Sequence, residues 1–146
     1  MSAVEIAQLG CGTFLLVGML TGFWKYRSMI TSEAGEAPVY VDICHRTALM
    51  YAFASLVLAE FARLSTWPDW VNTIGVALPL FFFCTSVAIY AVHGFLNDTD
   101  NQLRRPHRLG RRNVHGRAIS FYMYLLIVGE VGGFLVLFSG FLRSLV

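Results

Sequence analysis

The chain has 146 residues, of which 56% are hydrophobic and 14% charged, with a formal net charge of +2. Soluble domains carry about 25% charged residues, so this composition excludes a water-soluble globular enzyme. The length fits one domain, and we expect an all-α integral membrane four-helix bundle.

Four apolar segments have about the 20 residues that are needed to cross the hydrocarbon core of a bilayer. They lie near residues 4–24, 43–63, 71–95 and 118–142. Together they leave no room for a separate soluble domain. The whole chain, residues 1–146, is therefore predicted to be a single four-span transmembrane domain.

The first apolar segment is predicted to be a retained helix rather than a signal peptide. It contains Glu5 and lacks a basic stretch before it and a clear cleavage site after it. Trp24 and Lys25 follow as an interfacial anchor. The Gly18-x-x-x-Gly22 spacing favours close helix packing in lipid.

The second and third segments contain residues that predict local structure. Pro38 disfavours an earlier helix start and aspartate is a good N-cap, so the second helix is expected to begin near Asp42. Glu60 and Arg63 lie one turn apart and predict a local ion pair. Pro79 predicts a kink in the third helix.

The connection between the third and fourth segments, residues 97–117, is unusually basic. Its arginines are Arg104, Arg105, Arg108, Arg111, Arg112 and Arg117. With Lys25, Arg27 and Arg46, they place nine of the eleven basic residues on one side of the membrane. Because positive loops stay cytoplasmic during insertion, we expect both termini on the non-cytoplasmic side.

This orientation suggests a bacterial inner (plasma) membrane protein whose basic connection contacts anionic lipid head groups. The connection is expected to form either an ordered cytoplasmic cap or a flexible loop. Nucleic acid is not an expected partner. His107 and His115 lie in this connection without the spacing of a zinc site.

Glu130 lies midway along the fourth segment and is an intramembrane acid. Ionisable groups are costly there, about 2.5–3.5 kcal/mol for Asp, Arg or Lys at a helix centre. Glu130 is either a proton carrier, counter-ion or catalytic acid, or a hydrogen-bonded packing residue. The three cysteines are widely spaced and predict reduced thiols.

Two histidines and two tyrosines are predicted to lie in the cytoplasmic half of the bundle. His45, Arg46 and Tyr51 follow one another along the second segment, and Tyr90 and His93 share a face of the third. A neutral imidazole can ligate haem iron, and Arg46 can pair with a haem propionate. The alternative for each histidine is a hydrogen-bonded interfacial side chain.

Residues from about 15 to 95 resemble the styrene oxide isomerases and hydroxylaminobenzene mutases, which are small four-helix membrane proteins. The matching residues are Leu20-Thr21-Gly22, His45, Ala48-Leu49 and Tyr90, the last 45 residues after His45. The resemblance implies a trimer that binds haem b between adjacent subunits. Its ferric iron would act as a Lewis acid on an epoxide oxygen.

Carried over to this chain, the resemblance makes His45 the axial ligand of the haem iron and Tyr90 a hydroxyl that orients the substrate. Tyr51 is the second candidate catalytic residue. The chain departs from the family at two places. It has Tyr51-Ala52 where the family has Asn-Gly, and Phe81-Phe82-Phe83 in the third span, where the family has an aspartate. These departures leave the epoxide chemistry open.

Other functions fit the same residues. His45 and His93 could ligate haem from both faces, as in an electron carrier. The glycine-rich spans fit an accessory subunit of a membrane complex or a homo-oligomer. Glu130 could carry protons in a small-molecule exporter. Trimeric glutathione-transferring membrane enzymes share the size and span number, but here only His45-Arg46 and Glu60 match their pattern.

Overall fold

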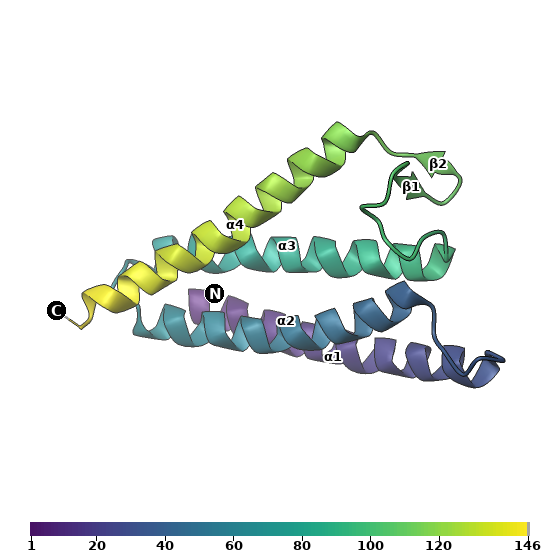
Figure 1. Ribbon diagram of the computed structural model, residues 1–146. Coiled ribbons are helices and arrows are strands. Elements are labelled where there is room, and N and C mark those ends of the chain that lie inside the picture. Colours follow the sequence, from purple (N-terminus) through teal and green to yellow (C-terminus); the bar gives the residue numbers. More distant parts are fainter. Residues whose placement is uncertain (146) are drawn as a thin grey trace.

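The computed structural model describes residues 1–145 and confirms an all-α bundle of four long helices (Figure 1). α1 spans Ala3–Thr31, α2 Val39–Leu64, α3 Asp69–Leu96 and α4 Gly116–Arg143. Each helix is long and apolar enough to cross a membrane. The chain is therefore an integral membrane protein with four candidate spans.

The outward faces of all four helices are apolar. Large hydrophobic side chains such as Leu20, Phe53, Phe81 and Val128 are more than half exposed. A continuous surface of this kind would promote aggregation in water. In a bilayer, this apolar surface is in contact with the hydrocarbon chains of the lipids.

The second helix begins earlier than the sequence predicts. Its N-cap is Pro38 rather than Asp42, because proline has no amide hydrogen to lose and suits the start of a helix. Asp42 lies in the first turn instead, where it pairs with Lys25 and Arg46. α3 continues through Pro79 as a single helix.

Two local predictions are confirmed. Arg63 and Glu60 form the expected ion pair, with 2.6 Å between Nη2 and Oε1. Cys11, Cys44 and Cys84 are free thiols.

α1 and α2 form the most extensive helix pair and lie side by side in Figure 1. Glycines in α1 allow this approach. A Cβ added at Gly18 would lie 2.5 Å from Leu49 Cδ2, and one added at Gly22 would lie 2.8 Å from His45 Cε1. The spacing of these two glycines therefore marks a helix contact, as predicted.

α4 touches α3 closely at one end and diverges from it toward the other (Figure 1). A Cβ added at Gly133 would lie 2.8 Å from the Gly75 carbonyl oxygen and 2.5 Å from Pro79 Cδ. The Phe82 ring packs directly against Gly129. The N-terminal half of α4 consequently stands away from α3.

The connection between α3 and α4 folds as a cap at this open end. It contains an antiparallel ribbon of β1 (Arg108–Leu109) and β2 (Arg112–Asn113). Gly110, with φ of +59°, makes the turn between them. The Gln102 amide donates to the Tyr40 hydroxyl of α2 at 2.6 Å, which ties the cap to the bundle.

Candidate functional site

His45 lies half-buried against α1, with its ring over Gly22. Its Nδ1 is 2.8 Å from the carbonyl oxygen of Gly18. Because a carbonyl can only accept, Nδ1 carries a hydrogen, and in a neutral imidazole Nε2 then has the lone pair. No hydrogen bond within residues 1–145 uses Nε2.

This arrangement is the one that metal-binding histidines adopt. A ligating imidazole usually donates its second ring N–H to a carbonyl or carboxylate, which fixes the tautomer and the ring orientation. For His45 the α1 backbone supplies that acceptor. In the neutral ring, this hydrogen bond leaves Nε2 as the nitrogen without a hydrogen-bond partner in residues 1–145.

Three charged side chains surround the start of α2 near His45. Asp42 accepts from Lys25 Nζ at 2.6 Å and from Arg46 Nη2 at 2.9 Å. The Arg46 side chain is 65% exposed, so its guanidinium can also reach an anionic group outside the bundle. The sequence did not predict the role of Asp42 as the shared partner of both cations.

The two candidate tyrosines have different neighbours. The Tyr51 ring stacks on Phe83 with centroids 3.9 Å apart, within the hydrophobic core. The Tyr90 ring lies 5.8 Å from that of Tyr40. In the described part of the chain, neither tyrosine hydroxyl is hydrogen-bonded to His45.

His93 is almost fully buried at the open end of α3, where its ring lies 4.9 Å from that of Tyr40. Tyr90 and His93 both contact Tyr40, which agrees with their predicted common face. His93 Nδ1 is 2.8 Å from Asp98 Oδ1, and Asp98 also accepts from the Gly110 amide. Burial opposes ionisation of Asp98, but these hydrogen bonds hold its pKa below the usual value.

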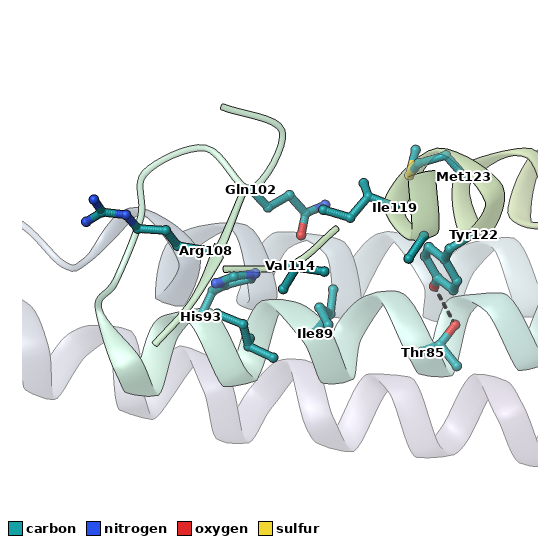
Figure 2. Close-up of a pocket in the computed structure, with 11 residues that line it drawn as sticks. Thr85, Ile89, His93, Gln102, Arg108, Val114, Ile119, Tyr122 and Met123 are labelled. Carbon is teal, nitrogen blue, oxygen red and sulfur yellow. Dashed lines mark hydrogen bonds between the residues drawn. The ribbon is translucent and has the colours of Figure 1, made fainter. Parts of the chain in front are cut away.

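A cavity of about 290 Å³ lies between α3, α4 and the cap, as Figure 2 shows. Its size is near the lower limit of about 300 Å³ for small-molecule pockets. The lining is mostly apolar, with Ile89 from α3 and Ile119 and Met123 from α4. A 2.7 Å hydrogen bond between the Thr85 and Tyr122 hydroxyls crosses it at one end.

Glu130 is half-buried in α4, and its Oε1 is fully buried. Within residues 1–145 this oxygen has no hydrogen-bond partner. Unpartnered buried polar atoms are uncommon in folded proteins. Glu130 is thus distinct from Glu60, whose carboxylate is paired and exposed.

The structure does not bring the predicted metal-binding residues together. His45 faces α1, whereas His93 faces Asp98 and the α3–α4 cavity. No group of three His, Cys, Asp or Glu side chains suited to a metal ion occurs in the described part of the chain. A haem iron needs no such group, since one protein ligand suffices.

Comparisons with protein-family models, curated proteins and solved structures give no significant match.

Proposed function

We propose that this integral membrane protein binds haem b, whose iron His45 would hold. The observation that carries the proposal is the hydrogen bond from His45 Nδ1 to the Gly18 carbonyl. It leaves Nε2 free and fixes the ring through the backbone of a neighbouring helix, as second-shell partners of ligating histidines do.

A homo-oligomer would supply the rest of the porphyrin site. His45 does not line the 290 Å³ cavity, and in this proposal the opposite wall of the haem site would come from outside this chain. A second protomer packed on α1 and α2 would provide it, in the trimer that the sequence resemblance implies. Arg46 and Lys25 would hold the propionates at the membrane boundary.

The same proposal places the basic connection in the cytoplasm and both termini outside, in a bacterial inner membrane. The support is the asymmetry of Lys and Arg between the two sides. His45 would then lie near the cytoplasmic boundary, within reach of both lipid-soluble and cytoplasmic compounds.

An isomerase fits the residues better than an electron carrier. The separate partners of His45 and His93 favour a single protein ligand, which would leave the iron accessible to a substrate. When bound, ferric haem would supply a Lewis acid for an oxygen-bearing substrate. Tyr90, at the edge of the core cluster, would orient that substrate, and Tyr51 would support it through its stack with Phe83.

Gly22→Ala should lower haem affinity by about 10–100-fold, the usual cost of disturbing a second-shell contact. The added methyl group would lie 2.8 Å from His45 Cε1 and would push the ring away from the Gly18 carbonyl. Haem titration of detergent-purified protein, followed by absorbance, measures the change.

Gly12→Ala is the matched control, because a Cβ at Gly12 meets nothing within 4 Å. It should bind haem as the natural protein does. Equal affinities for the two variants would contradict the role of His45.

A further inference from the structure

We propose that the cavity between α3 and α4 binds one acyl chain of an anionic phospholipid, whose phosphate is held by Arg108 at the rim. The site is separate from His45 and does not depend on haem binding. Three observations support it: the shape of the opening, its mostly apolar lining, and the unpaired charge at its rim.

The opening is built into the helix packing. α3 and α4 are in backbone contact at Gly75 and Gly133, and the Phe82 ring against Gly129 fills the space beyond. α4 therefore leaves α3 at an angle (Figure 1), and residues of both helices and of the cap line the cavity. An apolar space within a membrane-spanning bundle is filled by lipid more readily than by water.

The cavity has a mostly apolar lining and a cationic group at its rim. The apolar side chains come from both helices and from the cap: Ile89, Ala118, Ile119, Met123, Leu109 and Val114. The polar Thr85 and Tyr122 side chains at one end bond to each other (Figure 2). The Arg108 guanidinium extends from the rim away from the apolar lining. A mostly apolar cavity with a cation at its rim matches a phospholipid chain and its phosphate. An apolar helix of a second protein would offer no anionic group to Arg108.

The charge at the rim is not balanced within the protein. The cap has two acidic residues, of which Asp98 is bound to His93 and Gly110, and Asp100 is paired with Arg104 at 2.8 Å. Within residues 1–145, no carboxylate pairs with Arg117 in the first turn of α4 or with the cap's other arginines, which are Arg105, Arg108, Arg111 and Arg112. Guanidinium groups bind phosphate strongly through paired hydrogen bonds.

Native mass spectrometry with delipidated protein in detergent tests the site. Phosphatidylglycerol and phosphatidylcholine with the same acyl chains are added separately. We expect the natural protein to retain one phosphatidylglycerol per protomer, with a preference of about tenfold over phosphatidylcholine. Excess glycerol phosphate should not displace the lipid, because the chain provides part of the affinity.

Arg108→Gln should weaken phosphatidylglycerol binding by about tenfold. Arg111→Gln is the matched control: it removes the same charge from the turn of the ribbon, but Arg111 does not line the cavity. Arg111→Gln should have little effect on phosphatidylglycerol binding. Ala118→Trp, which fills the cavity from α4, should abolish retention while circular dichroism shows unchanged helix content.

Equal losses in Arg108→Gln and Arg111→Gln would overturn the proposal, since they would indicate diffuse attraction. Equal retention of the two lipids, displacement by glycerol phosphate, or lipid retention in folded Ala118→Trp would overturn it as well. If the natural protein is a dimer and Ala118→Trp dissociates it, then a second copy of the chain, and not a lipid, occupies the cavity.

Discussion

His45→Ala should remove the haem absorption band from the purified protein while leaving the bundle folded. The substitution deletes Nε2, the proposed ligand atom, together with the Nδ1 donor to Gly18. The half-buried imidazole contributes little to the core, which consists of other side chains. Absorption spectra and circular dichroism of protein produced with a supply of haem measure both effects.

His93→Ala is the control for this experiment. His93 has its own partner in Asp98 and faces the α3–α4 cavity, so its loss should leave the band in place. A colourless but folded natural protein would contradict the haem proposal. If the haem band persists in His45→Ala and disappears in His93→Ala, then His93 and not His45 ligates the iron.

Gly133→Ala should destabilise the bundle by about 1–3 kcal/mol, the usual cost of overpacking a tight contact. The new methyl group would lie 2.8 Å from the Gly75 carbonyl oxygen and 2.5 Å from Pro79 Cδ. Backbone and proline ring cannot rotate away as a flexible side chain would. α4 must therefore shift from α3 at the point where the two helices are joined.

Gly132→Ala provides the comparison, because a Cβ there meets nothing within 4 Å. The two positions are adjacent in the same helix and involve the same chemical change. Thermal unfolding in detergent should show a lower midpoint temperature for Gly133→Ala than for the natural protein. The midpoint of Gly132→Ala should be unchanged or slightly higher, since alanine has a higher helix propensity than glycine. Similar midpoints for the two variants would contradict the close contact.

Hydropathy predicts the number of helices but not where they end. Span length and the lack of charge are set by the bilayer, so the four apolar segments alone indicate a four-helix bundle. Helix ends lie beyond the hydrocarbon core, where capping residues and local hydrogen bonds decide at which residue a helix begins or ends. α1 therefore continues past residue 24 to Thr31, and Pro38 rather than Asp42 caps α2.

The candidate sites were only partly predictable for a different reason. The glycine spacing in α1 indicates a close contact, but nothing in the sequence shows that His45 bonds to the Gly18 carbonyl across it. Asp98 lies past the end of α3 and returns to His93 because Asn97 adopts a left-handed conformation, with φ of 45°. A backbone acceptor and a chain reversal leave little trace in sequence patterns.

The placement of both proposed sites at the cytoplasmic boundary requires the arginine-rich connection to face the cytoplasm. Fusions of alkaline phosphatase and of a green fluorescent protein to the C-terminus, compared in a bacterial host, test this most directly. We predict an active phosphatase and a dark fluorescent fusion, since both termini should lie outside. A bright fluorescent fusion with an inactive phosphatase would contradict the arrangement and the placement of His45 and Arg108 at the cytoplasmic boundary.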